Sequence, residues 1–491
     1  MKADILLYIE SATSDSDLSF LDMYLPELLA RRIQGTVQNC SVYYSVPPSY
    51  QGKLSGTASC IVRSGHDDVA FWKELFARTG SDHICKIYAD SPFLDPSIIG
   101  EMMDLHLTYL AEFTYSENLP AGFSCETVSK ELIAAIPELK EQTLPLAQVI
   151  KSNLNQFDIE IYYKDPDIRD KRISFRSANR RDALIMERIY RLGSSIPSYE
   201  SLKGIIEEHP EVLHVGPSYL EIELTGRCDL ECLFCYRNSL KQHHGDMEKN
   251  SVALVLEQMK PFGLPYTICF GGSGEPLMHP NVYEILSMVA GDPLVETIIV
   301  ETNGLYADVN YRTHLGSSGE KIKTIVNING YNSETYGKLH GKEFFDRVHQ
   351  NILGLAESAT GRLYIQIMKI NETEPFLDSY YDYWEKLKIP IILQKQNTYL
   401  GRIPDRRYSD LSPLDRIPCW HLQRDLYITA DGTVTFCKQD VDGNCAQGTM
   451  GSSTLAEIWE KKRQAFINDY RKQYPAMPDC KSCDEWYTFN A

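Results

Sequence analysis

The sequence lacks any long run of apolar residues. The short apolar segment at residues 5–9 is followed by Glu10 and is shorter than the core of a secretory signal peptide. No segment approaches the roughly 18 apolar residues that a membrane-spanning helix requires. We therefore expect a cytoplasmic protein with no membrane partner.

Basic residues are also scarce. The chain has 49 Lys and Arg against 67 Asp and Glu, which gives a formal charge of −18. Binding to nucleic acid or to an anionic membrane needs clustered Lys and Arg to neutralise phosphate, so we expect neither partner. The 491 residues suggest about three domains.

Cysteine is present in quantity, at 13 residues. In the cytoplasm such residues are more often reduced or bound to metal than joined in disulfides. Six are scattered: Cys40, Cys60, Cys85, Cys125, Cys269 and Cys445. The other seven fall into patterned groups, namely Cys228, Cys232, Cys235, Cys419, Cys437, Cys480 and Cys483.

The first group follows an alternating apolar run at residues 219–224, which predicts a strand. Cys228, Cys232 and Cys235 have C-x3-C-x2-C spacing. Three thiolates this close together can hold three corners of a cubic iron–sulfur cluster and leave one iron open, whereas a structural zinc site would need another ligand nearby. A zinc knuckle or buried reduced cysteines remain the alternatives.

Strand-like runs recur after this group, with helical stretches between them. The first helix is marked by Val252, Val255, Leu256 and Met259 at amphipathic spacing. The later runs lie at residues 267–271, 297–302, 322–328, 363–370 and 391–396. With residues 219–224 they make six β/α units, and a ligand is expected at the carboxyl ends of the strands.

Polar motifs stand at those strand ends. Residues 270–280 contain the run Gly-Gly-Ser-Gly-Glu, in which glycines permit close backbone approach and Glu275 can accept an ammonium group. Thr302 and Asn303 follow the third strand, and Asn327 follows the fourth. Each motif alone is also compatible with an ordinary turn.

Together these motifs resemble those of the radical S-adenosylmethionine (SAM) superfamily. The resemblance implies a partial (β/α)6 TIM-like barrel. It also implies a [4Fe–4S] cluster on Cys228, Cys232 and Cys235, whose open iron chelates SAM and whose electron cleaves it to an adenosyl radical. The implied SAM-binding residues are Phe234, Gly272, Gly274, Glu275, Thr302, Asn303 and Asn327. Ser273 is an insertion relative to the family's Gly-Gly-Glu-Pro motif.

A second cysteine set lies near the carboxyl end. Cys419 and Cys437 bracket a predicted hairpin that turns at Asp431-Gly432, and Cys480 and Cys483 follow a predicted helix. Four cysteines form a closed shell that suits zinc as well as an iron–sulfur cluster. The spacing resembles the twitch form of the SPASM domain, which implies a small α+β domain with one auxiliary [4Fe–4S] cluster.

Two residues just after Cys437 are candidate catalytic groups. Oxidation of a substrate needs a base, for which Asp440 is the candidate, and epimerisation needs a hydrogen donor, for which Cys445 is the candidate. Asp440 could equally be a residue of a solvent-exposed loop, and for Cys445 that alternative is favoured.

The amino-terminal segment alternates strands and helices. Strands are predicted at residues 5–9, 40–46 and 83–88, and helices at 18–32, 69–78 and 96–110, a pattern typical of a parallel α/β sheet. Asp90 follows a strand. It could bind a hydrated Mg²⁺, but on residue type alone it is favoured as the cap of the helix near Pro96.

This segment resembles the cytidylyltransferases that activate acidic sugars, which implies a nucleotidyltransferase-like, GT-A/Rossmann-like α/β domain. The motifs are Gly65-His-Asp-Asp-Val, Tyr88-Ala-Asp-Ser-Pro, Leu94-Asp-Pro and Pro120-Ala-Gly-Phe-Ser-Cys-Glu. Two features depart from that family. The loop at residues 10–17 is acidic where the family's is basic, and Arg176 stands where a carboxylate is expected. The predicted domain is therefore degenerate as a catalyst.

The predicted organisation is a cytidylyltransferase-like domain at 1–195, a linker at 196–217, a radical SAM barrel at 218–400 and a twitch domain at 415–491. The order resembles that of the spiro-SPASM group. We predict an oxidoreductase or epimerase acting on a carbohydrate, with a flavodoxin- or ferredoxin-like electron donor. Alternatives are a peptide- or protein-modifying enzyme, a non-catalytic metal-binding or electron-transfer protein, and a CTP-dependent transferase.

Overall fold

The computed structural model describes residues 2–54, 58–63, 65–136, 144–317, 320–359, 361–409, 412–475 and 477–488. The chain divides into two compact units, Met1–Val212 and Leu213–Ala491. The four-part division expected from the sequence stays a prediction.

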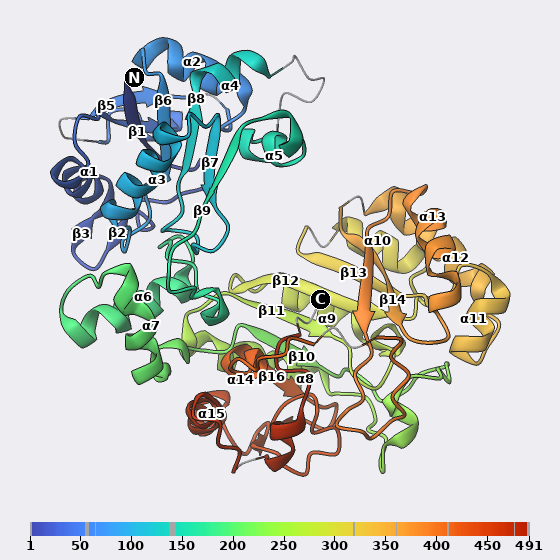
Figure 1. Cartoon of the computed structure of the whole chain (residues 1–491). Helices are drawn as coiled ribbons and strands as arrows, with labels where there is room; N and C mark the ends of the chain where they lie inside the picture. Colours follow the sequence, from blue (N-terminus) through green and yellow to red (C-terminus); the bar gives the residue numbers. More distant parts are fainter. Residues whose placement is uncertain are drawn as a thin grey trace. The chain divides into compact units, whose positions relative to one another are not determined.

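The amino-terminal unit is built on a seven-stranded sheet (Figure 1). Its strands are β1 (Ala3–Tyr8), β4 (Val42–Val46), β5 (Ser59–Val62), β6 (His83–Tyr88), β7 (Phe113–Ser116), β8 (Glu126–Ser129) and β9 (Ile159–Tyr162), in the order β5-β4-β1-β6-β8-β7-β9. The expected parallel pairing holds among β1, β4, β5 and β6. β8 is antiparallel to both β6 and β7, because it follows β7 without a crossover helix. The sheet is therefore mixed.

Helices accompany this sheet along the described part of the unit. They are α1 (Leu25–Thr36), α2 (Val69–Thr79), α3 (Pro96–Thr108), α4 (Lys130–Ala135), α5 (Leu146–Lys151), α6 (Arg180–Gly193) and α7 (Tyr199–Glu208). The helix predicted at 18–32 begins only at Leu25, because β2 (Ser19–Phe20) and β3 (Met23–Tyr24) form a hairpin before it. Pro26 then occupies the first helical turn, where its missing N–H is not needed.

Helix α7 lies inside residues 196–217, the expected linker. Its side chains Tyr199, Leu202 and Ile206 are fully buried. The Tyr199 hydroxyl also donates a 2.9 Å hydrogen bond to the Pro166 carbonyl. The segment that was expected to be a linker therefore contains a packed helix, which includes Ser201 and Gly204.

The carboxyl-terminal unit contains the six predicted strands of the barrel. They are β10 (Tyr219–Ile222), β11 (Tyr266–Phe270), β12 (Val295–Thr302), β13 (Ile322–Asn327), β14 (Leu363–Lys369) and β15 (Ile391–Lys395). Each pairs in parallel with the next. The partial (β/α)6 barrel and its strand positions are confirmed.

Helices separate these strands: α8 (Lys249–Met259), α9 (Val282–Ala290), α10 (Val309–Ser317), α11 (Ser333–His340), α12 (Phe345–Ser358) and α13 (Leu377–Glu385). In Figure 1, α10 to α13 lie together on one side of β13 and β14. The main apolar core lies between helices and sheet, and it takes alternate strand residues such as Leu220, Ile268 and Ile298. The residues between them face the barrel interior.

The side chains that face the barrel interior form two layers. The deeper layer is a small apolar cluster of Tyr219, Cys269, Ile299 and Ile325, with Tyr364 and Ile392 packed against it. Two residues further along each strand come Glu221, Gly271, Glu301, Asn327, Gln366 and Gln394, which line a cavity. The apolar layer therefore closes the bottom of the barrel and the polar layer opens at the carboxyl ends of the strands.

The remaining strands continue the same nine-stranded sheet. They are β16 (Asp425–Ile428), β17 (Thr433–Thr435) and β18 (Gly448–Thr449), accompanied by α14 (Trp420–Arg424) and α15 (Leu455–Tyr470). The predicted hairpin is confirmed, since β16 and β17 are antiparallel. β16 also pairs in parallel with β10, so that this hairpin extends the barrel sheet.

The predicted capping box at the start of α15 is present. The Thr454 side chain accepts from the Glu457 N–H, and the Glu457 side chain accepts from the Thr454 N–H. Within the part of the chain that the structure describes, no helix has the length and apolar character needed to cross a membrane.

Candidate functional site

A cavity of about 700 Å³ opens at the carboxyl ends of the barrel strands. Every residue assigned from the sequence to the first cluster or to SAM lines it: Cys228, Cys232, Phe234, Cys235, Gly272, Gly274, Glu275, Thr302, Asn303 and Asn327. Their individual roles stay predictions. The structure does bring all of them to one cavity from four strand ends.

The cysteine loop is docked on the end of helix α11. The Leu233 N–H donates to the Leu339 carbonyl at 2.9 Å, and the Glu231 N–H donates to the His340 carbonyl at 3.2 Å. The last carbonyls of a helix have no partner within the helix, so the cysteine loop satisfies them. Gly341, at φ +71°, ends the helix where any β-carbon would meet the Glu231 carbonyl oxygen at 2.9 Å.

The three cysteines are half-buried, and the loss of solvent around each thiol raises its pKa. Thiolates in such surroundings require a nearby positive charge, which bound irons would supply. Among the described residues no three Cys, His, Asp or Glu side chains converge as ligands of a single metal ion. In a cubic cluster each cysteine binds a different iron, so thiolates spread around a cavity fit this group.

The glycine loop after β11 packs directly on the cysteine loop. The Glu275 N–H donates to the Arg227 carbonyl at 2.7 Å. A β-carbon at Gly274 would lie 1.8 Å from the Thr225 carbonyl oxygen and 2.9 Å from that of Arg227. Glycine is therefore required at 274, because the two loops touch backbone to backbone.

The inserted Ser273 has a defined partner. Its N–H donates to the Glu223 carboxylate at 2.9 Å, and its hydroxyl donates to the same oxygen. Glu223 is buried on the strand-end side of β10 and also accepts from the Ala430 N–H at 3.4 Å. The insertion is thus held by a buried carboxylate from the neighbouring strand.

Glu275 is buried at the centre of this arrangement. Its carboxylate accepts from the Thr302 hydroxyl and the Asn303 N–H, both at 2.7 Å, and from the Leu277 N–H at 3.1 Å. Burial raises its pKa to about 7, although these hydrogen bonds oppose the shift. A carboxylate has about four acceptor positions, so one remains for an ammonium donor.

Several cavity residues were missed from the sequence. Glu221 and Glu301 face the interior from β10 and β12, and Lys438 reaches the same place from beyond β17, with its Nζ 3.8 Å from a Glu221 carboxylate oxygen. Burial and the neighbouring Glu221 carboxylate raise the pKa of Glu301. Alternation along the two strands could have predicted both glutamates, but the sequence holds no signal for Lys438.

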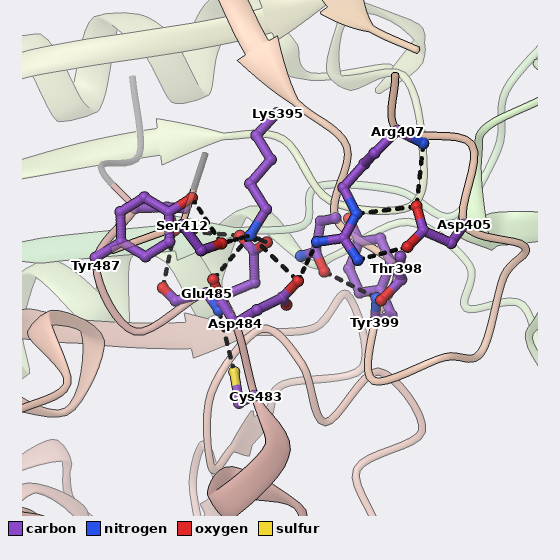
Figure 2. A network of polar contacts seen from close by, with 12 residues as sticks. Lys395, Thr398, Tyr399, Asp405, Arg407, Ser412, Cys483, Asp484, Glu485 and Tyr487 are labelled. Carbon is purple, nitrogen blue, oxygen red and sulfur yellow. Dashed lines mark hydrogen bonds and ion pairs between the residues drawn. The ribbon is translucent and has the colours of Figure 1, made fainter. Parts of the chain in front are cut away.

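The carboxyl-terminal segment lies beside the end of β15, the edge strand of the barrel sheet, and its residues Glu485, Tyr487 and Thr488 line the cavity (Figure 2). Lys395, at the end of β15, lies 3.3 Å from the Asp484 carboxylate and 3.1 Å from that of Glu485. Arg407 joins Asp484 to Asp405. This network ties the edge strand to the residues that directly follow Cys483.

The second cysteine set also surrounds a single cavity. Cys419, Cys437, Cys480 and Cys483 all line a second, smaller cavity. The Cys419 N–H donates to the Asp469 carboxylate at 2.6 Å, and Arg416 joins that carboxylate at 3.1 Å to the Cys480 and Cys483 carbonyls. Four thiols around one cavity can each bind a different iron of a cubic cluster, whereas among the described side chains no group of three converges on a single ion such as zinc.

Asp440 and Cys445 line neither cavity. The Asp440 carboxylate accepts from the backbone N–H groups of Cys445, at 3.0 Å, and Phe436, at 3.4 Å. Asp440 therefore holds its own loop together, and the geometry does not support the catalytic roles expected for the two residues.

In the amino-terminal unit, Asp90 is paired with Arg176. The Arg176 Nε donates to the Asp90 carboxylate at 2.9 and 3.1 Å, and its Nη2 lies 2.7 Å from Glu10. The guanidinium also lies 3.9 Å from the centre of the Tyr88 ring. The cap of α3 is Asp95, which accepts from the Ser97 N–H at 3.0 Å, so the favoured cap role of Asp90 is wrong.

We expect this unit to show no CTP-dependent release of pyrophosphate with Mg²⁺. Arg176 already satisfies the carboxylate that would bind the cation, and Asp90 is only 2% exposed. The measurement is a coupled pyrophosphate assay with CTP and acidic sugars. Turnover that is lost in Asp90→Ala would contradict this prediction.

The sequence is similar to curated proteins over very different lengths, as two of them show. An uncharacterized protein of Treponema pallidum is 27% identical over 356 residues, which cover 70% of this chain and 97% of that protein. The tungsten-containing aldehyde ferredoxin oxidoreductase cofactor-modifying protein of Pyrococcus furiosus is 34% identical over 71 residues, 14% of this chain and 20% of its own length. The match to this relative, whose name states a function, therefore spans about a fifth of the relative's length.

Among solved structures, BtrN in complex with AdoMet and 2-DOIA aligns with 55% of this chain and 93% of its own, at 19% identity and a TM-score of 0.38. A cytidylyltransferase from Leptospira borgpetersenii aligns with 43% of this chain and 96% of its own, also at 19% identity and a TM-score of 0.38.

Family models match two parts of the chain. Residues 222–374 match the radical SAM superfamily, and residues 419–484 match the SPASM iron–sulfur cluster-binding domain. The first implies SAM and a [4Fe–4S] cluster as cofactors, and the second implies auxiliary iron–sulfur clusters. The chain thus contains a radical SAM domain followed by a SPASM domain.

Proposed function

We propose that this protein is a radical SAM enzyme that oxidises or epimerises a sugar or a nucleotide-linked sugar. The observation that carries the proposal is the composition of the barrel cavity. Its rim holds the residues expected to bind the cluster and SAM, and its interior presents hydrogen-bonding side chains, including Glu221, Asn327, Gln366, Gln394 and Asn397. Such a lining suits a substrate rich in hydroxyl groups.

The size of the cavity favours a small substrate. Its volume of about 700 Å³ lies within the range of small-molecule sites. The same volume has to hold SAM, and the segment around Glu485, which pairs with Lys395, takes up part of the cavity wall. A compact sugar is therefore favoured over a long extended peptide, which is the alternative substrate.

When bound, the cluster and SAM supply an adenosyl radical that removes a hydrogen atom from the substrate. The protein's part is to hold the reactants in place. Glu275 offers its remaining acceptor position to the SAM ammonium group, while the backbone around Gly272 and Gly274 allows close approach. The Glu301 carboxylate, in the same cavity, replaces Asp440 as the proposed acceptor of the substrate hydroxyl proton.

The second cysteine set lies next to the reaction cavity. Lys438 and Glu485 line both cavities. A closed four-cysteine centre beside the substrate is suitably placed to take up an electron from it. We propose a single auxiliary [4Fe–4S] cluster there, with a flavodoxin- or ferredoxin-like protein as the electron donor to the first cluster.

The test begins with protein reconstituted without oxygen. We expect four irons at each of the two cysteine sites and release of 5′-deoxyadenosine from SAM after reduction with dithionite. A panel of sugars and sugar nucleotides carrying deuterium at their carbinol carbons then identifies the substrate class, because deuterium should appear in the 5′-deoxyadenosine.

The controls separate the alternatives. Zinc alone at the first cysteine site, or intact SAM after reduction, would contradict the radical SAM assignment and favour a non-catalytic metal-binding protein. Cleavage of SAM with deuterium transfer only from labelled peptides would retain the enzyme class and overturn the sugar substrate.

A further inference from the structure

His340 lies beside the first cysteine site and was not among the residues expected from the sequence. It is the last residue of α11 and is only 1% exposed. Its Nδ1 lies 3.1 Å from the Cys232 Sγ. Its Nε2 accepts a hydrogen bond from the Asn329 N–H, also at 3.1 Å.

These two contacts determine which ring nitrogen carries the proton. A backbone N–H is always a donor, so the Nε2 that faces Asn329 must present a lone pair. The proton of the neutral ring is therefore on Nδ1, and it points at the Cys232 sulfur. An Nδ1 that carries a proton has no lone pair for a metal, so His340 is a hydrogen-bond donor to the cysteine and not a fourth metal ligand.

Packing keeps the ring in this orientation. The Tyr336 ring stacks on it with centroids 4.3 Å apart, and Phe234 contacts it edge-on at 5.9 Å. A half-turn of the imidazole would exchange each nitrogen for a carbon and lose both hydrogen bonds. The donor position is thus defined by contacts on three sides.

We propose that His340 is a positioning residue that donates an N–H···S hydrogen bond to the Cys232 thiolate and so makes the cluster easier to reduce. The inference rests on the proposed function, because it requires an iron–sulfur cluster on Cys228, Cys232 and Cys235. Reduction adds negative charge to the cluster and its sulfurs, and a hydrogen bond to sulfur stabilises that charge more in the reduced state. Asn303 contributes a longer contact, with its Nδ2 3.8 Å from the Cys228 Sγ.

Two substitutions separate the hydrogen bond to sulfur from the hydrogen bond to Asn329. In His340→Gln, the side-chain carbonyl can reach the Nε2 position and still accept from Asn329, but the donor to Cys232 is lost. In His340→Asn, the side-chain amide can take the Nδ1 position and keep the donor, while the acceptor is lost. If His340 served only to support the structure, both substitutions would disturb the site in the same way.

The measurement is a redox titration of the reconstituted protein without SAM, followed by the EPR signal of the reduced cluster. We expect His340→Gln to disfavour reduction about tenfold, a shift of about 59 mV to more negative potential. His340→Asn should stay close to the unchanged protein. Equal potentials in all three proteins, or equal shifts in both variants, would overturn the proposal.

A second measurement needs no variant and remains decisive if the variants fail to bind iron. Protein labelled with 15N-histidine should show a coupling between one imidazole nitrogen and the reduced cluster, together with an exchangeable proton. Absence of both couplings would contradict the hydrogen bond. Failure of the proposed function is a separate outcome, since it would appear as absence of the four-iron cluster itself.

Discussion

Replacing Gly274 with alanine is expected to reduce SAM cleavage by about 100-fold or more. The new β-carbon would lie 1.8 Å from the Thr225 carbonyl oxygen, so the glycine loop and the cysteine loop would have to separate. Displacements of about 1 Å in a catalytic arrangement can cost about 100-fold in rate. Overpacking of this kind also costs about 1–3 kcal/mol of stability. Release of 5′-deoxyadenosine under single-turnover conditions measures the first effect and thermal unfolding the second.

Gly245→Ala provides the matched control. Gly245 lies opposite Gly226 in the same region, and a β-carbon there would meet no atom within 4 Å. We expect SAM cleavage close to that of the unchanged protein. If Gly274→Ala were equally active, the close approach of the two loops would not matter for SAM binding.

Replacing Asp469 with alanine is expected to destabilise the second cysteine site by about 3–5 kcal/mol, the usual result of breaking a buried ion pair from one side. Its carboxylate accepts hydrogen bonds from the Cys419 N–H and from the Arg416 guanidinium. Arg416 also donates hydrogen bonds to the backbone carbonyls of Cys480 and Cys483. Asp469 is 4% exposed, so its loss leaves Arg416 without its carboxylate partner in a largely buried setting. Iron counting should show loss of the second cluster while the first is retained.

The control for this substitution is Glu460→Ala on the same helix. Glu460 forms an exposed pair with Arg463, at 2.7 Å, and such pairs contribute little to stability. We expect a change within about 0.5 kcal/mol and full iron content. Full occupancy of both sites in Asp469→Ala would show that the cysteines hold their geometry without this network.

The barrel could be predicted because its signals are local. Each strand alternates between core-facing and cavity-facing residues over a few positions, and each strand-end motif stands directly after its strand. The cysteine, glycine and asparagine motifs therefore reach the same cavity once the strands are parallel. The hairpin at Asp431-Gly432 and the capping box at Thr454 are short-range in the same way.

The features that were missed depend on distant contacts. His340 is 108 positions from Cys232 along the chain, and Lys438 reaches the cavity from beyond the sixth barrel strand. Asp440 has the chemistry of a base, but its loop uses the carboxylate to accept backbone N–H groups. The sequence likewise favoured Asp90 as a helix cap, but its carboxylate is paired with Arg176, which is 86 positions away. Residue type alone does not distinguish these uses.

The pairing of β16 with β10 sets an order of events during synthesis. The register joins Tyr219 to Asp425, so the first barrel strand gains its second neighbour only after about two hundred further residues have left the ribosome. Until then the backbone N–H and carbonyl groups along one edge of β10 are unpaired and could form hydrogen bonds with another chain. The first barrel strand therefore stays open to non-native pairing until β16 has been synthesised.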